Sequence, residues 1–259
     1  AVERGCNTVQ IFSRNPRGWA SKPLSDGDTD LFRAKIKTTG ILPVDHMPYL
    51  PNLASPKTEI YEKSVATLSA ELDRCGRLGI PYLVTHLGHH LGDGMAGGRM
   101  RVIHAISTAL GDADNAVMLL LENTAGEKNS VGSEFGHIRA IMDGLPFPGR
   151  IGVCFDTCHA FAAGYELRTG EGLEETLAQF EEQVGLKNLK LIHLNDTKGD
   201  KGSGLDRHEH IGMGFIGEDG FRRILHHKTF ASLPLVCETP VDDRRDDRGN
   251  IAKVRDLAG

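Results

Sequence analysis

Short apolar segments alternate with helical segments along the whole chain, and this alternation limits the fold more than any other feature. Each apolar segment is rich in β-branched or large aliphatic residues, and each leads into a polar loop. Apolar runs of this kind are typical of strands. The seven predicted strands cover residues 8–12, 40–46, 82–86, 117–123, 151–156, 189–196 and 233–239.

The segments between the strands have helical periodicity. Ser25 or Asp26 fits the N-terminal cap of the first helix, and Ser55 with Pro56 fits the start of the second. The predicted helices cover residues 26–37, 56–76, 97–110, 133–144, 173–184, 218–227 and 250–257. Because strands that alternate with helices form right-handed βαβ units, we expect an α/β fold with a parallel sheet. A length of 259 residues, without an internal repeat or a linker, predicts one domain over residues 1–259.

The residues at the strand ends distinguish two ways of arranging a parallel sheet. In a doubly wound open sheet, polar residues gather at one switch point, whereas in a (β/α)8 barrel, or TIM barrel, they follow nearly every strand. Six of the seven predicted strands end in a residue that can bind a metal, namely His46, His86, Glu122, Asp156, His193 and Glu238. This favours the TIM barrel. A TIM barrel has eight strands, so we expect its first strand to precede Ala1.

Residues 191–217 contain the densest group of metal-binding side chains. One strand and the loop after it hold His193, Asp196, Asp206, His208 and His210. Imidazole and carboxylate ligands together suit zinc better than magnesium or calcium. The strand ends and loops supply nine candidate ligands in all: His46, His86, Glu122, Asp156, His159, His193, Asp206, His208 and Glu238. Nine donors are too many for one zinc ion, and they suit two or three ions if a carboxylate bridges.

Several of these residues also have a purely structural interpretation. Glu122 is a candidate for a hydrogen-bonded core carboxyl group, Asp156 for the cap of the next turn, and Glu238 for an ion pair. The joint pattern favours metal binding over these separate interpretations.

Composition and missing motifs exclude other function classes. The net charge of −5 argues against binding nucleic acid through bulk positive charge, although bound metal ions would offset it locally. The five cysteines are widely spaced among apolar residues, which predicts reduced thiols in a cytoplasmic protein. No apolar run reaches the roughly 18 residues of a membrane helix, so we expect no membrane partner. Phosphate-loop, dinucleotide-binding and serine-nucleophile motifs do not occur, and we expect no organic cofactor.

Seven motifs, in order from Gln10 to Pro240, resemble those of the endonuclease IV family of abasic-site DNA repair enzymes. The motifs are QIFSRNPRGW, HMPYLPNLASP, THLGHHLG, LLLENTAG, GVCFDTCHAFAAGYELR, LIHLNDTKGDKGSGLDRHEHIGMGFIG and LVCETP. The resemblance implies a TIM barrel with three zinc ions. It also implies hydrolysis of the phosphodiester bond 5′ to an abasic site in duplex DNA, which leaves a 3′-hydroxyl and a 5′-deoxyribose phosphate. The family's opening strand, of the GAHVS type, has no counterpart in this chain.

The resemblance further implies a role for each site residue. In the order of the three ions, the implied ligands are His46, His86 and Glu122; Glu122, Asp156, His193 and Glu238; and His159, Asp206 and His208. Glu122 thus bridges two ions, and it is the candidate catalytic residue that orients the attacking water. His89, His90 and His210 are candidates for groups that support the ligands, and a solvated-loop interpretation stays open for them.

Arg17, Tyr49 and Leu50 match family positions that enter the DNA minor groove, a task that suits arginine and apolar wedges. Because an abasic nucleotide lacks stacking, turning it out of the duplex costs less than for a normal base. Packing beneath the loop is the alternative for Tyr49 and Leu50, and Trp19 is more typical of a packing anchor. We expect a monomer that acts on duplex DNA.

Two other functions stay open at this point. A sugar isomerase or epimerase of the xylose isomerase-like barrels would use Glu122, Asp156, His193 and Glu238 for a single metal, without the other five donors. A non-catalytic zinc-dependent DNA-binding module would bind abasic DNA without cutting it.

Overall fold

The computed structural model describes all residues, 1–259, and divides them into two compact units. Unit 1 comprises residues 1–121 and 140–152, and unit 2 comprises residues 122–139 and 153–259. Each unit has parallel strands joined by helices, as the alternation of apolar and helical segments predicts. The expectation of one domain over residues 1–259 stays a prediction.

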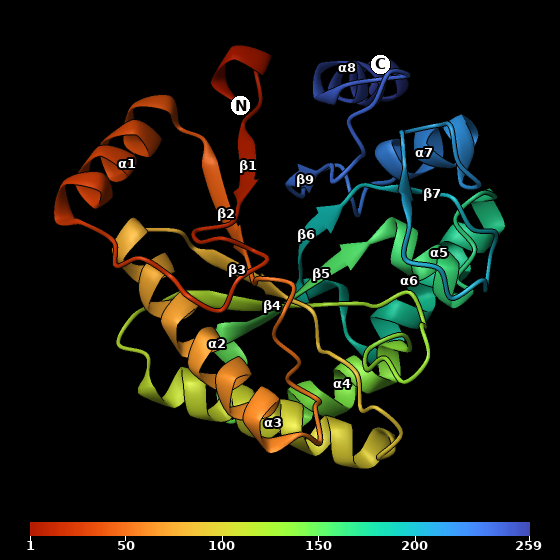
Figure 1. Cartoon of the computed structure of the whole chain (residues 1–259). Helices are drawn as coiled ribbons and strands as arrows, with labels where there is room; N and C mark the ends of the chain where they lie inside the picture. The colour runs from red at the N-terminus through yellow and green to blue at the C-terminus, as the bar shows by residue number, and fades with distance from the viewer. The chain divides into compact units, whose positions relative to one another are not determined.

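Four parallel strands form the centre of unit 1 (Figure 1). Their spatial order follows the chain: β1 (Thr8–Ile11), β2 (Leu42–His46), β3 (Tyr82–Thr85) and β4 (Met118–Glu122). The last residue of β4, Glu122, is counted with unit 2. The register pairs Val44 with Tyr82 and Leu83 with Leu119, and it aligns the carboxyl ends of neighbouring strands. Ligand candidates at the strand ends are therefore placed along one edge of the sheet.

The helices of unit 1 begin and end close to the predicted positions. They are the 3-10 turn η1 (Val2–Arg4) and the α-helices α1 (Asp26–Thr39), α2 (Thr58–Leu78) and α3 (Met95–Asp112). Ser25 caps α1, since its hydroxyl accepts the N–H of Asp28 at 3.0 Å. The prediction that Ser55 caps α2 is wrong: its hydroxyl accepts the N–H of Lys57 in a turn, and the helix begins at Thr58. The helices α2 and α3 lie side by side (Figure 1).

Unit 2 contains three further parallel strands and a small hairpin. Parallel pairing joins β5 (Ile151–Asp156) to β6 (Leu189–His193) and β6 to β9 (Leu235–Val236). An antiparallel pair, β7 (Asp196–Thr197) and β8 (His208–Glu209), closes the loop after β6. The strand predicted over 233–239 is only two residues long, because the residues after Val236 leave the ladder to bring Glu238 beside Asn195.

The helices of unit 2 include one that the sequence pattern missed. They are α4 (Phe135–Asp143), whose last residues belong to unit 1, α5 (Thr157–Ala163), α6 (Gly170–Gln183), α7 (Gly217–His226) and α8 (Asp247–Ala258), with the 3-10 turn η3 (Leu186–Asn188). The 3-10 turn η2 (Pro148–Arg150) belongs to unit 1. The missed helix is α5, all of whose residues but Ala163 are buried. It has no polar face, so it lacks the periodicity that marks a surface helix.

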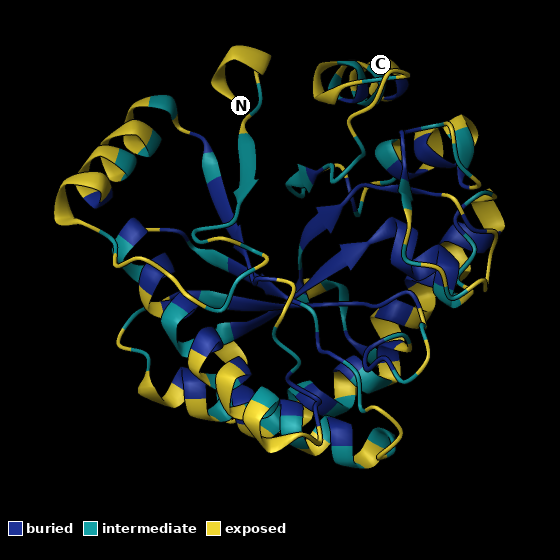
Figure 2. Ribbon diagram, viewed as in Figure 1, coloured by how far each residue is buried: buried dark blue, intermediate teal, exposed yellow.

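Strands β4, β5 and β6 are almost entirely buried, β1 is of intermediate burial, and most helices have exposed faces (Figure 2). All five cysteines are free thiols, as predicted. None of the helices combines the length and the apolar composition that a membrane-spanning helix needs.

Candidate metal centre

The carboxylate of Asp196 fixes the loop that carries most of the candidate ligands in unit 2. It is fully buried and accepts the backbone N–H groups of Gly212, Gly214 and Ile216 at 3.0, 2.9 and 3.0 Å. A β-carbon on Gly214 would lie 2.3 Å from the carbonyl oxygen of Thr197, so the turn accepts only glycine there. Asp196 is therefore a structural residue, which agrees with its absence from the predicted ligands.

Four predicted ligands meet at the ends of the strands. Glu122, Asp156, His193 and Glu238 each offer an atom within 4.8 Å of the others. The Nδ1 atom of His193 is 3.0 Å from Glu122 Oε1 and 3.1 Å from Glu238 Oε2. It lies 3.8 Å from Asp156 Oδ2. Three carboxylates around one imidazole form a concentrated negative site, which a divalent cation would neutralise.

Three further predicted ligands, His159, Asp206 and His208, form a second group in unit 2. The Oδ1 atom of Asp206 is 3.2 Å from His159 Nε2 and 3.6 Å from His208 Nε2. The buried Nε2 atom of His208 has no hydrogen-bond partner. Since a buried polar atom without a partner is costly, this atom needs a ligand that the protein itself does not supply.

Hydrogen bonds on the other ring nitrogens set the orientation of both histidines. The Nδ1–H of His159 donates to the carbonyl oxygen of Asn123 at 2.9 Å, and that of His208 to the carbonyl oxygen of Glu238 at 2.9 Å. With the proton on Nδ1, the Nε2 lone pair of each ring points toward Asp206. This is the arrangement in which proteins hold metal-binding imidazoles.

The carboxylates also change the protonation of the buried histidines. Burial lowers the pKa of His159, but Asp156, Asp206 and Glu122 outweigh it and hold the pKa well above its usual value. Burial also lowers the pKa of His193, but Cys154 and Glu238 outweigh it and hold the pKa well above its usual value. The donor set, its charge and the unpartnered Nε2 of His208 fit divalent cations.

His46 and His86 lie next to each other in unit 1. Their ring centroids are 5.2 Å apart, and the rings are nearly perpendicular. His46 ends β2, and its Nδ1 contacts the carbonyl oxygen of Met47 at 2.7 Å. The two predicted ligands of the first ion are therefore brought together within their unit.

Two asparagines that the sequence pattern did not single out hold the ligands in place. Asn195 Nδ2 donates to Asp156 Oδ2 at 2.6 Å, and its Oδ1 accepts the N–H of Glu238 at 2.7 Å. Asn123 Oδ1 accepts the N–H of Asp156 at 2.8 Å. The thiol of Cys158 also lies close to Asp156 and His208, and burial raises its pKa to about 12. The only signal in the sequence is that both asparagines follow a strand end.

The three histidines with open roles have separate partners. His210 is fully buried between the Asp242 carboxylate, 2.9 Å from Nε2, and Asn250 Nδ2, 3.0 Å from Nδ1. The Nδ1 atom of His90 accepts the N–H of Gly94 at the start of α3. His89 binds Asn52 through its backbone. For His210, the solvated-loop interpretation is therefore wrong.

The predicted DNA-contact residues lie on two neighbouring loops of unit 1. Arg17 is exposed on loop 13–21, and Tyr49 and Leu50 follow β2 with 59% and 38% exposure. The Tyr49 ring is 5.2 Å from the ring of Phe12, which in turn is 5.5 Å from His46. The alternative that Tyr49 and Leu50 pack beneath the loop does not agree with this exposure.

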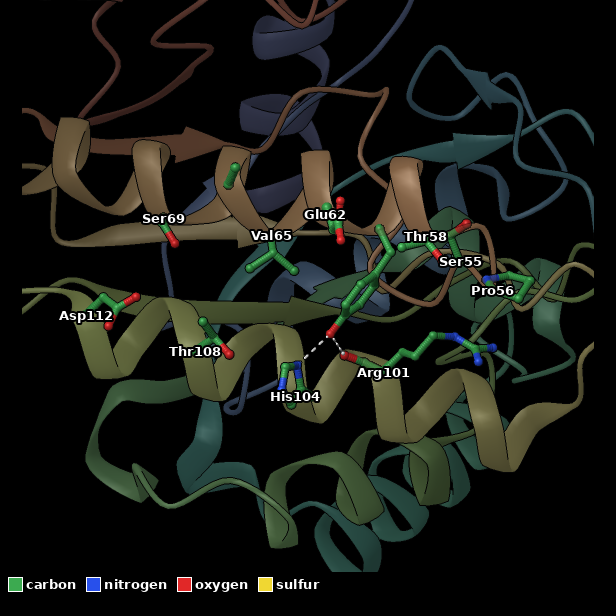
Figure 3. A pocket seen from close by; sticks show the side chains of 12 residues that line it. Ser55, Pro56, Thr58, Glu62, Val65, Ser69, Arg101, His104, Thr108 and Asp112 are labelled. Atoms are coloured by element: carbon green, nitrogen blue, oxygen red, sulfur yellow. Dashed lines mark hydrogen bonds between the residues drawn. The ribbon is translucent and has the colours of Figure 1, made fainter.

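A groove of about 590 Å³ between α2 and α3 contains none of the predicted site residues (Figure 3). The Tyr61 hydroxyl, which lines it, donates to the carbonyl oxygen of Arg101 at 3.1 Å and lies 2.9 Å from His104 Nδ1. These contacts join the two helices, and the groove is part of their packing.

Comparisons with known proteins agree with this geometry. A family model described as xylose isomerase-like TIM barrel matches residues 1–257. The probable endonuclease 4 of Methanoculleus marisnigri is 63% identical over 261 residues, which cover 100% of this chain and 93% of the relative. The chain belongs to the endonuclease IV family. The crystal structure of endonuclease IV from Thermus thermophilus has a TM-score of 0.85 at 33% identity, and the match covers 99% of this chain and 90% of the Thermus chain.

Membership of the endonuclease IV family confirms the predicted TIM-barrel class and the prediction of an enzyme. A D-tagatose 3-epimerase-like protein has a TM-score of 0.72 at 16% identity, and the match covers 97% of this chain and 86% of the other. This likeness shows the shared fold alone.

Proposed function

We propose that this protein is a DNA repair endonuclease that hydrolyses the phosphodiester bond 5′ to abasic sites in duplex DNA. Its products would be a 3′-hydroxyl and a 5′-deoxyribose phosphate. Family membership supports an abasic-site endonuclease. The observation that carries the proposal is the pair of ligand groups in unit 2, seven predicted residues whose donor atoms face one another.

The proposed cofactor is three zinc ions per chain. His46 and His86 would hold one, in agreement with their neighbouring rings. The group of Glu122 and His193 would hold a second, and the group of His159 and His208 a third. Mixed imidazole and carboxylate ligands are those that zinc prefers. The assignment of Glu122 as a bridge to the ion of His46 and His86 rests on the order of the sequence motifs.

When bound, zinc ions acidify a water molecule and neutralise the charge of phosphate oxygens. The chain's own residues supply orientation. Glu122, fully buried at the end of β4, is the proposed catalytic residue that directs the attacking water toward phosphorus. Asn195 and Asn123 hold the Asp156 carboxylate and backbone, so that the ligand set is in place before the substrate arrives.

The proposed substrate contacts are Arg17, Tyr49 and Leu50. The exposure of all three residues, and the position of the Tyr49 ring 6.5 Å from that of His46, support contact with the strand near the lesion. Arginine pairs with phosphate, and the apolar side chains fill the space that the missing base leaves. Action as a monomer in the cytoplasm belongs to the same proposal, with free cysteines that suit a reducing compartment.

The test is incision of a duplex that carries a single abasic site, with metal counting on the same sample. We expect one nick 5′ to the site, loss of activity with a chelator, recovery with zinc and about three ions per chain. An intact duplex of the same sequence is the control. Binding without incision would favour the DNA-binding module instead.

The group of Glu122, Asp156, His193 and Glu238 alone would also suit a sugar isomerase with one metal. The second group in unit 2 argues against this function, because an isomerase does not need it. One manganese or magnesium ion per chain, with isomerase activity, would decide for the alternative.

A further inference from the structure

Loop 13–21 of unit 1 carries Arg17 and the only tryptophan of the chain, Trp19. The loop follows β1 and contains no helix or strand of its own, so its conformation depends on side-chain contacts. Those contacts converge on Glu71, a residue of α2 whose side chain is fully buried. A buried carboxylate persists only where opposite charges and hydrogen bonds compensate for its lost hydration.

Three side chains compensate the charge of Glu71. The Ser13 hydroxyl donates to Glu71 Oε2 at 2.6 Å, and Arg14 Nη1 is 3.3 Å from Oε1. Arg74 Nε lies 3.9 Å from Oε1 and donates to Ser13 Oγ at 2.9 Å. Only 4% of the Arg14 side chain and 10% of the Arg74 side chain are exposed. We call these four residues the Glu71 cluster.

The same arginines hold the backbone of the loop. Arg14 donates to the carbonyl oxygen of Trp19, and Arg74 donates to the carbonyl oxygens of Ser13 and Lys22. The Glu71 cluster thus contacts the loop at its start, near Trp19 and just beyond its end. Arg17 lies between these points, and the N–H of Arg17 donates to Asn15 Oδ1 at 3.0 Å.

We propose that Glu71 is a positioning residue for the DNA substrate, which acts through Ser13 and Arg14 to fix the loop that presents Arg17. This inference rests on the proposed function. Glu71 itself is buried and meets no substrate. Its replacement should therefore weaken binding of the duplex while metal content and the rate of the bound complex stay unchanged, because the loop becomes mobile and must be ordered on binding.

The test uses Glu71→Gln, which keeps the shape of the side chain and removes its charge. Because uncompensated arginines can unfold this variant, Ser13→Ala serves as a milder second variant. Glu62→Gln is the matched control, the same change at an exposed position of the same helix. We expect KM for abasic duplex to rise about tenfold for Glu71→Gln and less for Ser13→Ala, with kcat and zinc content as in the control.

Trp19 gives a readout that needs no DNA. We expect its fluorescence to shift to longer wavelength in both variants, and acrylamide to quench it more readily, since the loop that carries the ring loses the backbone contacts made through Ser13 and Arg14. Unchanged fluorescence in a folded Glu71→Gln protein would overturn the proposal, and so would a fluorescence change without any change of KM. If the unaltered protein does not cut abasic DNA, the proposed function fails, and Trp19 quenching still decides whether Glu71 fixes the loop.

Discussion

The backbone N–H of Tyr49 donates a hydrogen bond of 2.9 Å to the carbonyl oxygen of Pro16. The two residues are far apart in the sequence, and the bond fixes the loop after β2 to the loop that carries Arg17. The rings of Tyr49 and His46, with centroids 6.5 Å apart, place this pair of loops beside a proposed zinc ligand. The loop of Arg17 and the loop of Tyr49, which carry the proposed DNA contacts, are therefore joined directly, next to the proposed zinc ligand His46.

Replacement of Arg17 by alanine should raise the Kd for abasic duplex by roughly tenfold and leave zinc content unchanged. The side chain is exposed and belongs to none of the ligand groups, so its loss removes only a substrate contact. Binding is best measured at two salt concentrations, because the loss of one phosphate contact also flattens the salt dependence. Equal affinity at matched salt would contradict the role of Arg17.

Replacement of Glu122 by glutamine should reduce incision by roughly a thousandfold or more with the fold intact. Glutamine matches the carboxylate in size, but it has no charge to hold or bridge cations. The readouts are the single-turnover cutting rate, metal content and circular dichroism. Cutting at the normal rate by a folded variant would remove Glu122 from the mechanism.

Replacement of His208 by alanine should lower metal content by about one ion per chain and spare the other sites. His208 contributes a buried Nε2 atom without a hydrogen-bond partner, within the group that would hold the third ion. Elemental analysis after dialysis measures the loss. His226→Ala, at an exposed position on α7, is the control; equal metal content in the two variants would exclude His208 as a ligand.

Acid should weaken the contact between Glu166 and Arg168. Hydrogen bonds from the Arg168 side chain lower the pKa of Glu166 to about 2. A carboxyl group with a lowered pKa stabilises the fold at pH values above its unfolded-state pKa of about 4.5, and this stabilisation is lost as the pH falls toward 2. Glu166→Gln should therefore be less stable than the unaltered protein at pH 7, with a smaller further loss in acid. Denaturant unfolding at several pH values, with exposed Glu182→Gln as control, measures this difference.

Gly88 should tolerate no side chain. A β-carbon there would lie 2.3 Å from Asn52 Oδ1, and the backbone φ is +88°, a conformation that favours glycine. Asn52 joins the loop after β2 to the loop after β3, because its Oδ1 accepts the N–H of His89 at 2.9 Å. We expect Gly88→Ala to lower the free energy of unfolding by about 1–3 kcal/mol. Gly92→Ala, at a positive φ with open space around it, separates backbone strain from the clash.

The strand ends could be predicted because each ligand follows a short apolar run. This rule places His46, Glu122, Asp156 and His193 on the residues that end β2, β4, β5 and β6. His159 was predicted in the loop after a strand, but it lies on α5, a helix that the sequence pattern missed because it lacks periodicity. Asn195 contacts Asp156 and Glu238, which are 39 and 43 positions away in the sequence, and Glu71 contacts Ser13, which is 58 positions away. Such contacts leave no local pattern, so they require the folded structure.

The Asp196 carboxylate accepts five backbone N–H groups, and these hydrogen bonds hold the loop around His208 in its conformation without a metal ion. Removal and rebinding of a metal ion at this part of the centre should then be fast and repeatable. Both would require only diffusion and ligand exchange, and the loop would not have to refold. The metal-free protein would then stay folded during metal starvation and become active again when the proposed zinc ions are available.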